Sequence, residues 1–233
     1  MGGLAAVGGP TWRSMRGNLS GVDGVTIRDA HDADVAAITA IQNAFIATEA
    51  IEWTDTPHTV GERAVWLAAQ QADGLPVLVA TAAADDGEVV GWASFGPFRD
   101  SQKWPGYRLT VEHTIHVHRD HWGAGVGRTL MLALIHRATA MGLHVMVAAV
   151  DGKNDASIRF HERLGFREVA RMPEIGTKFG RWLDLVLLQL VLGDAPAPNI
   201  LAMEGSGYPL DNDELEGDDE PIDLGDIDLP PGA

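Results

Sequence analysis

The chain has 233 residues, no cysteine, and 17 basic against 33 acidic residues, which gives a formal net charge of −16. This length suffices for one domain with a buried core and two tails. The lack of cysteine excludes disulfides, iron–sulfur clusters, cysteine-bound zinc and a thiol nucleophile. The surplus of acid argues against a nucleic-acid partner, and the longest apolar run, residues 143–150, is too short to cross a bilayer. These features predict a soluble, cytoplasmic protein that binds neither nucleic acid nor membrane.

The two ends differ in composition from the rest of the chain. Residues 1–22 are rich in Gly and Ala, and their charged residues follow the small ones, which is not the order of a signal peptide. Residues 193–233 contain 12 Asp or Glu residues and no Lys or Arg. We therefore expect a flexible leader over 1–22, a folded domain over 23–193 and a disordered acidic tail over 194–233. A docking role for the tail stays open beside a purely solvating one.

In the first half of the folded part, strand and helix patterns alternate, and a turn sequence separates two runs of β-forming residues. Two runs of this kind predict an antiparallel hairpin. The predicted elements are a strand (25–28), a helix (about 35–45, with Asp32 or Asp34 as N-cap), a helix opened by Thr59 or Gly61 and ending at Gln71, and a hairpin of residues 76–81 and 88–95 around Asp85-Asp86-Gly87.

Residues 108–118 alternate strictly and predict a strand with two distinct faces. Glu112 shares its face with Thr and His side chains, whereas His113 shares the other face with aliphatic side chains. The first face holds Thr110, Glu112, Thr114 and His116, and the second holds Leu109, Val111, His113, Ile115 and Val117.

A glycine-rich turn, Gly123-Ala-Gly-Val-Gly127, connects this strand to a helix, and a strand that is apolar on both faces follows. Such a strand is buried and parallel to the earlier one, so the three elements predict a right-handed βαβ unit. The second half is predicted to contain a helix with the buried stripe Val126, Leu130, Leu134, Ala138 and Met141, a strand (143–150), a helix (154–164, ended by Gly165) and two strands (about 168–172 and 183–191).

The glycine turn is the first feature of the sequence that indicates ligand binding. Free N–H groups at a helix N-terminus, together with the helix dipole, form a natural seat for a diphosphate. Three spaced glycines also occur in dinucleotide folds and in ordinary turns. However, the elements that precede the turn do not fit a dinucleotide fold, and no Gly-Lys-Ser/Thr sequence indicates a P-loop.

The order of elements, with Val117–Arg128 and the pair Asn154–Ser157 and His161–Phe166, resembles the GCN5-related N-acetyltransferase (GNAT) superfamily over about residues 25–192. Three further blocks resemble its phosphinothricin and methionine sulfone branch: Thr110–Thr114, Gly142–Ala149 and Gly176–Leu185. The resemblance implies the GNAT fold, an α/β (α+β) architecture in which about four helices flank a mixed central sheet of six to seven strands. It also implies a homodimer.

The resemblance implies acetyl-CoA as co-substrate. The main chain of one strand would pair with the pantetheine arm, the glycine loop would hold the diphosphate, and Asn154 would contact the coenzyme beyond it. Trp122 departs from the family, which has Gln or Arg where the loop opens, so we expect weaker or rearranged cofactor contacts and not loss of the site. The implied cofactor-binding residues are Ile115, His116, Val117, Gly123, Ala124, Gly125, Val126, Gly127, Arg128 and Asn154.

Two residues are candidates for proton transfer. An amine must be neutral to attack a thioester, and Glu112 can remove its proton directly or through water. By spacing alone, Glu112 could equally pair with an Arg on a neighbouring element, and the resemblance favours the catalytic role. His161 stands where many members of the superfamily have a Tyr that protonates the departing thiolate, and an imidazole of ordinary pKa could donate there. Alternatively, His161 packs in the cleft or binds a carbonyl group.

An amino-acid acceptor carries a carboxylate, which suits an Arg in its pocket. Arg99 matches the family's substrate loop, although this loop is a few residues longer here. The His residues lack a recognisable zinc spacing, so we expect no metal. The substrate-binding candidates are Arg99, Asp100, Ser101, Tyr107, Arg108, Glu112, His113 and Thr114, and Lys178, Phe179 and Trp182 could line the same cleft or belong to the core.

Together these features predict an acetyl-CoA-dependent N-acetyltransferase that acts on the α-amino group of a small amino acid or analogue, of the phosphinothricin, methionine sulfone or methionine sulfoximine type. The reaction would be a direct attack within a ternary complex. The alternatives are a protein N-terminal or side-chain acetyltransferase and a non-catalytic acyl-CoA sensor.

Overall fold

The computed structural model describes residues 24–82 and 87–193. The predicted leader and acidic tail therefore lie outside the described residues, as do Asp85 and Asp86 of the predicted turn. The described residues form one mixed sheet in the order β1-β2-β3-β4-β5-β7-β6. Its strands are β1 (Val25–Asp29), β2 (Val77–Ala82), β3 (Glu88–Pro97), β4 (Thr110–Val117), β5 (Val145–Asp151), β6 (Arg167–Lys178) and β7 (Arg181–Val191).

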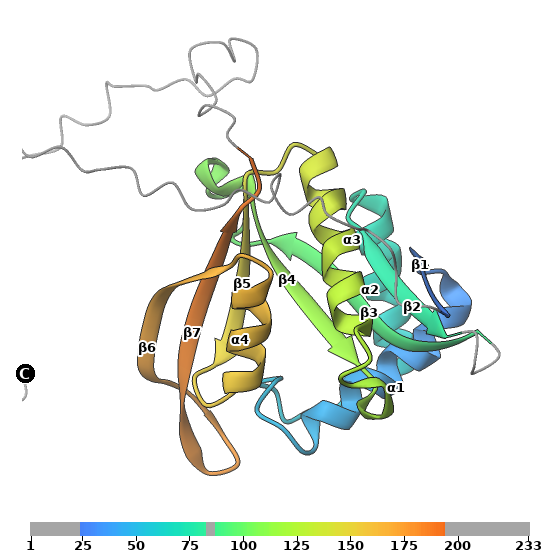
Figure 1. Cartoon of the computed structure of the whole chain (residues 1–233), viewed down its shortest axis with the longest axis horizontal. Coiled ribbons are helices and arrows are strands. Elements are labelled where there is room, and N and C mark those ends of the chain that lie inside the picture. The colour runs from blue at the N-terminus through green and yellow to red at the C-terminus, as the bar shows by residue number, and fades with distance from the viewer. Residues whose placement is uncertain (1–23, 83–86, 194–233) are drawn as a thin grey trace, which may run out of the picture. The chain divides into compact units, whose positions relative to one another are not determined.

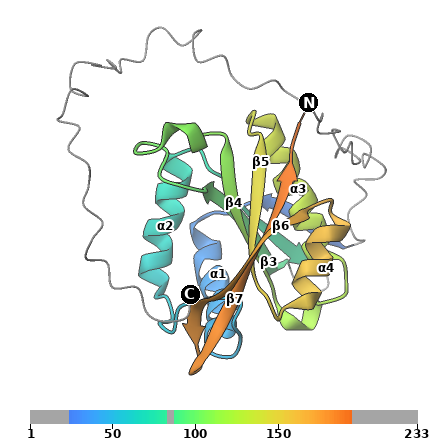
Figure 2. The same cartoon turned by 90° about the vertical axis from the view of Figure 1, so that its left-hand side faces the viewer.

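Helices cover both faces of the sheet. In Figure 2 the strands separate α1 and α2 on one side from α3 and α4 on the other. This arrangement confirms the predicted mixed sheet with four flanking α-helices. The helices are α1 (Val35–Ile46), α2 (Val60–Ala72), α3 (Val126–Ala140) and α4 (Asp155–Arg163).

Most predicted elements are confirmed, and the differences occur at their ends. β2 and β3 form the predicted antiparallel hairpin, and β5 runs parallel to β4. β6 is longer than predicted. Its full length was not recognised because it is an edge strand whose side chains are mostly exposed, and its sequence therefore lacks the apolar pattern of a buried strand. Met141 does not belong to the buried stripe of α3, because the helix ends at Ala140 and leaves this side chain 43% exposed.

Asp34, one of the two predicted candidates, occupies the N-cap position of α1, and Thr59 occupies that of α2. Asp34 makes no capping hydrogen bond to α1. Its carboxylate instead accepts hydrogen bonds of 2.6 and 2.7 Å from the Arg28 guanidinium, which ties β1 to the start of the helix. Thr59 caps α2, where its hydroxyl oxygen accepts a hydrogen bond from the backbone N–H of Glu62 and the Glu62 carboxylate accepts one in return from the Thr59 N–H.

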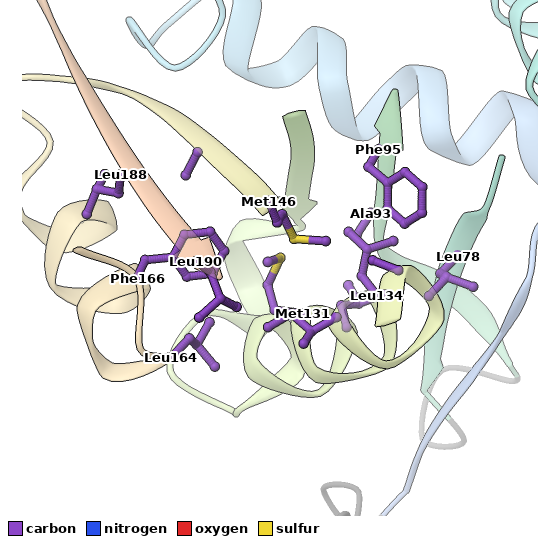
Figure 3. Packing of buried hydrophobic residues seen from close by; sticks show 14 of the residues in the cluster. Leu78, Ala93, Phe95, Met131, Leu134, Met146, Leu164, Phe166, Leu188 and Leu190 are labelled. Carbon is purple, nitrogen blue, oxygen red and sulfur yellow. The ribbon is translucent and has the colours of Figure 1, made fainter. Parts of the chain in front are cut away.

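Two apolar cores hold the layers together. The larger core fills the space between the sheet and helices α3 and α4, and Figure 3 shows Met131 and Leu134 of α3 against Ala93 and Phe95 of β3 and Met146 of β5. The smaller core packs α1 and α2 against the opposite face. Because both faces are buried, the central strands are fixed, and the functional residues on β4 have a rigid base.

The decisive feature of the fold is that β4 and β5 separate. They pair only from Thr110–Val145 to Glu112–Val147, although both strands continue beyond these residues. Figure 1 shows the two strands diverging from that point. The edge of β4 after Glu112 therefore has no strand partner on this side, and Ala149 of β5, predicted to be buried, is exposed. The gap leaves main-chain groups free for a ligand.

Candidate active site

The glycine loop has a backbone geometry that suits an anion at the start of α3. Gly123 and Gly125 adopt left-handed backbone angles, with φ of 77° and 84°, which residues other than glycine adopt only at a cost. Gly125 is the N-cap of α3, no side chain caps the helix, and its first turn contains no acidic residue. The first N–H groups of α3 are therefore available to an anion, with the helix dipole favouring it.

A cavity of about 820 Å³ runs from this loop into the gap between β4 and β5. Its size falls in the range of small-molecule and cofactor sites. Of the ten predicted cofactor-binding residues, only Ala124 does not line it; this residue is exposed. Those that line it are Ile115, His116, Val117, Gly123, Gly125, Val126, Gly127, Arg128 and Asn154.

Trp122 changes the edge of this cavity. Its indole N–H donates a 2.8 Å hydrogen bond to the carbonyl oxygen of Val117, and its ring stacks on Phe45 with centroids 6.0 Å apart. The side chain thus uses the main-chain acceptor of Val117, which is one of the residues expected to pair with pantetheine. This geometry gives a physical reason to expect rearranged cofactor contacts.

A second cavity, of about 270 Å³, adjoins the first along β4. It brings Glu112, His113, Thr114 and His161 to one place. Both cavities are lined by Ile51, Ile115, His116, Asp151, Asn154 and Ser157. The two cavities therefore form one cleft, with the glycine loop at one end and Glu112 at the other.

The Glu112 carboxyl group is suited to accept a proton. Burial raises its pKa above the usual value for glutamate, although the positive charge of Arg99 opposes this shift. A carboxylate with a raised pKa is a stronger base than an exposed one. Arg99 is exposed and lines neither cavity, but its charge acts on Glu112 at the mouth of the site.

The other predicted residues of the substrate loop are not brought into the cleft. Neither cavity is lined by Asp100, Ser101, Tyr107 or Arg108. The Asp100 carboxylate accepts hydrogen bonds from the backbone N–H groups of the two residues that follow Ser101. The extra residues of this loop lead into a short 3-10 turn that ends at Tyr107, which directs the loop away from Glu112.

His161 and His113 lie against each other, with ring centroids 5.1 Å apart. Burial lowers the pKa of both imidazoles, and the His113 ring has no hydrogen-bond partner among the described residues. The Nδ1–H of His161 donates to the backbone carbonyl of Ser157 at 2.8 Å, while its buried Nε2 has no partner there. The pKa of His161 is therefore not the ordinary one: burial lowers it, which favours the neutral ring, and with Nδ1–H directed at Ser157 the neutral ring has its lone pair at Nε2.

The sequence did not point to the segment between α1 and α2 as part of the site. Ile51, Glu52 and Trp53 line the smaller cavity, and Glu52 Oε1 accepts a 2.8 Å hydrogen bond from His116 Nε2. His116 was predicted only as a main-chain contact for the cofactor. No local motif marks Glu52, because its role depends on the contact between this segment and β4, which lie more than 60 residues apart in sequence.

The C-terminal hairpin differs from expectation. Phe179 and Trp182 are exposed and line neither cavity, so they belong neither to the cleft nor to the core. Lys178 is buried, and its ammonium group donates to the backbone carbonyl of Glu49 at 2.9 Å.

In the described ranges 24–82 and 87–193, no three His, Asp or Glu side chains gather as a metal-ligand set. No helix of this part is long and apolar enough to cross a membrane.

A cleft with a glycine loop and a free helix N-terminus at one end and a partly buried carboxylate at the other suits a group-transfer enzyme with a long, phosphorylated donor. The model of the acetyltransferase (GNAT) family matches residues 40–166. The L-methionine sulfoximine/L-methionine sulfone acetyltransferase of Salmonella typhimurium is 46% identical over 175 residues, which are 75% of this chain and 99% of the relative. The chain therefore belongs to the GNAT acetyltransferase family.

Solved structures agree with this assignment. The Salmonella typhimurium acetyltransferase yncA, with its cofactor acetyl-CoA, superposes with a TM-score of 0.71 at 46% identity and covers 76% of this chain and 98% of its own. A GNAT superfamily phosphinothricin acetyltransferase from Sinorhizobium meliloti, in complex with acetyl-CoA, gives a TM-score of 0.70 at 33% identity and covers 76% and 92%.

Proposed function

We propose that this protein transfers the acetyl group of acetyl-CoA to the α-amino group of a small amino acid or analogue, of the methionine sulfone, methionine sulfoximine or phosphinothricin type. The observation that carries the proposal is that Glu112, with its raised pKa, stands in a small cavity continuous with the glycine-loop cleft. Relatives named for these acceptors support the choice of substrate class.

The residues of the cleft fit acetyl-CoA. The N–H groups at the start of α3 would hold the diphosphate, and Asn154 would contact the same molecule. The main chain of β4 from Ile115 through His116 to Val117, where Trp122 already occupies the Val117 carbonyl, would pair with the pantetheine amides. When bound, acetyl-CoA supplies an activated acyl group as a thioester.

Glu112 would act as the general base. Its carboxylate removes a proton from the acceptor ammonium group, directly or through one water, so that the neutral amine can attack the thioester carbonyl. Arg99, whose charge acts on Glu112, would bind the acceptor carboxylate at the mouth of the cavity. The smaller cavity holds about 270 Å³, which suits a single amino acid. Of the remaining candidates, His113 and Thr114 line this cavity, and Asp100, Ser101, Tyr107 and Arg108 stay proposals for its outer rim.

His161 would serve the departing thiolate. Burial lowers the pKa of His161 and favours the neutral ring, whose Nδ1–H is directed at Ser157. In this form, Nε2 would first accept a proton released in the reaction and then donate it to sulfur. With this order of proton transfers, His161 keeps its predicted role as proton donor to the thiolate, but it acts as a proton shuttle and not as an imidazolium that is charged from the start.

Turnover assays test the proposal. We expect acetyl-CoA consumption, measured as thiol release, with methionine sulfone, methionine sulfoximine or phosphinothricin, and N-acetylated products by mass spectrometry. A protein acetyltransferase would instead modify peptides and leave these amino acids unchanged. A non-catalytic sensor would bind acetyl-CoA in calorimetry without releasing thiol. Either of these results contradicts the proposal.

The proposal includes a homodimer formed through the hairpin of β6 and β7. β6 is an edge strand, and an exposed edge with large apolar side chains favours association with another chain. A second copy of this chain is the partner we propose. The exposed apolar side chains of the hairpin are Val169, Met172, Ile175, Phe179, Trp182 and Val191.

Replacing Trp182 by Lys should convert the dimer to a monomer, because this side chain is 61% exposed and is the largest apolar one on the hairpin surface, and a charge there would be desolvated by association. Light scattering coupled to size exclusion measures the mass. Val65→Lys is the matched control, since Val65 is an even more exposed apolar residue on α2. A monomeric wild type, or a dimer unaffected by Trp182→Lys, contradicts the assignment.

We also propose that the protein acts in the cytoplasm and binds neither nucleic acid nor membranes. The net charge of −16 supports this, because phosphate-rich partners repel an acidic surface.

A further inference from the structure

Glu52 is a second carboxylate in the acceptor cavity. The segment between α1 and α2 contributes it to the lining, opposite the face of β4 that carries Glu112, Thr114 and His116. Glu112 and His116 are four residues apart on one strand, which corresponds to about 13 Å. Because Glu52 contacts the His116 ring, its carboxylate and that of Glu112 stand toward opposite ends of the same cavity.

The two carboxyl groups have opposite electrostatic environments. Burial would raise the pKa of Glu52, but hydrogen bonds from His116 and Gln42 and the charge on His116 lower it below the usual value. For Glu112, burial outweighs the opposing positive charge of Arg99 and raises its pKa. Two carboxyl groups whose pKa values are shifted apart serve different roles. Glu112 is suited to take up a proton, whereas Glu52 stays ionised and is suited to accept hydrogen bonds.

One oxygen of Glu52 is left for a ligand. His116 Nε2 and Gln42 Nε2 both donate to Oε1, at 2.8 and 3.0 Å, and neither of these bonds uses Oε2. The side chain of Glu52 is 21% exposed, and the residue lines the cavity. A partly buried anion with one committed oxygen favours a ligand that can donate a hydrogen bond.

The segment that carries Glu52 is held in position. The buried ammonium group of Lys178 donates to the backbone carbonyls of Glu49 and Glu52. The ring of Trp53 lies against Gly176 of β6, where any Cβ atom would collide with it. The C-terminal hairpin therefore holds the residues on both sides of the Glu52 side chain in place. A carboxylate that is held in this way can select among ligands, because it does not adapt its position to them.

We propose that Glu52 determines acceptor specificity: its free oxygen accepts a hydrogen bond from an N–H group on the side chain of the acceptor, while Glu112 serves the α-amino group. This inference rests on the proposed function. Methionine sulfoximine and methionine sulfone form a natural test pair, because they differ only in that the sulfoximine has an N–H where the sulfone has an oxygen. The sulfoximine can donate to Glu52, whereas the sulfone presents only acceptors to an anion.

The test compares kcat/KM for the two acceptors at saturating acetyl-CoA. The wild type should prefer the sulfoximine by about tenfold to a hundredfold, as expected for a hydrogen bond to a charged group. Glu52→Gln retains the shape and the contact with His116 but removes the charge, and should reduce the preference to threefold or less. Glu52→Asp retains the charge but withdraws the carboxylate, and should give an intermediate preference.

Asp55→Asn is the matched control, because Asp55 is an exposed carboxylate on the same segment that lines neither cavity; it should keep the wild-type preference. Thermal unfolding and acetyl-CoA binding verify that each variant is folded. A wild type without preference, or an equal loss of both acceptors in Glu52→Gln, overturns the specificity role. A wild type that turns over neither acceptor contradicts the proposed function itself, and this proposal with it.

Discussion

Glu112→Gln should lower kcat by about 10²-fold to 10³-fold, with only a small change in KM for acetyl-CoA. Loss of a positioned general base has an effect of this size, and the substitution keeps the shape of the side chain. Glu112 lines the smaller cavity and not the larger one, so coenzyme binding should persist. Steady-state thiol release with methionine sulfone gives kcat, and calorimetry gives acetyl-CoA affinity.

The pH dependence provides an independent check of the same residue. A base works only when deprotonated, so activity should fall as pH decreases through the pKa of Glu112, which burial raises above its usual 4.5. Glu112→Gln should remove this acidic limb and leave the limb of the acceptor amine. Glu88→Gln, at an exposed position on β3, is the matched control. A variant at position 112 with wild-type kcat and an unchanged acidic limb would exclude the general-base role.

Gly125→Val should raise KM for acetyl-CoA at least tenfold. Gly125 is the N-cap of α3 with φ of 84°, and a β-branched residue strongly resists this conformation. The loop must then rearrange, which misdirects the N–H groups that we propose for the diphosphate, and a side chain would enter the larger cavity. Substrate-saturation curves and direct titration with coenzyme A measure the effect.

Backbone strain alone must be separated from loss of the diphosphate seat. Gly142→Val serves as the control for strain. Gly142 follows the C-terminal end of α3 with φ of 75°, and a Cβ added there would meet no other atoms. It also lines neither cavity. The substitution should lower thermal stability while acetyl-CoA affinity stays near that of the wild type. Equal losses of affinity in the two variants would show that strain, and not the anion site, explains the result at Gly125.

Local patterns predicted the elements well where one face is buried. The β2–β3 hairpin, the parallel β4–β5 pair and the glycine loop all follow from periodicity and turn residues. They failed where tertiary contacts override local preference. Asp34 takes the predicted N-cap position of α1, but its side chain does not cap the helix, because its carboxylate forms a bidentate ion pair with Arg28.

The residues of the candidate site differ in the same way in how well the sequence predicted them. The cofactor residues lie on consecutive stretches of β4 and α3, so one motif marks nearly all of them. The acceptor residues come from separate elements, and the substrate loop that resembles the family's is longer and leaves Asp100 and Tyr107 outside the cavity lining. The lowered pKa of His161 could not be anticipated, since it depends on burial, and the direction of its Nδ1–H depends on the carbonyl of Ser157.

The sequence by itself determined the fold class, the glycine loop and the position of Glu112, because each is encoded by residues close together in the chain. Only the tertiary structure decided where β4 and β5 part, how the proton is held at His161, and that Glu52 faces the acceptor cavity. These features depend on side chains brought together from distant segments, and their charge and burial exist only once the layers have packed.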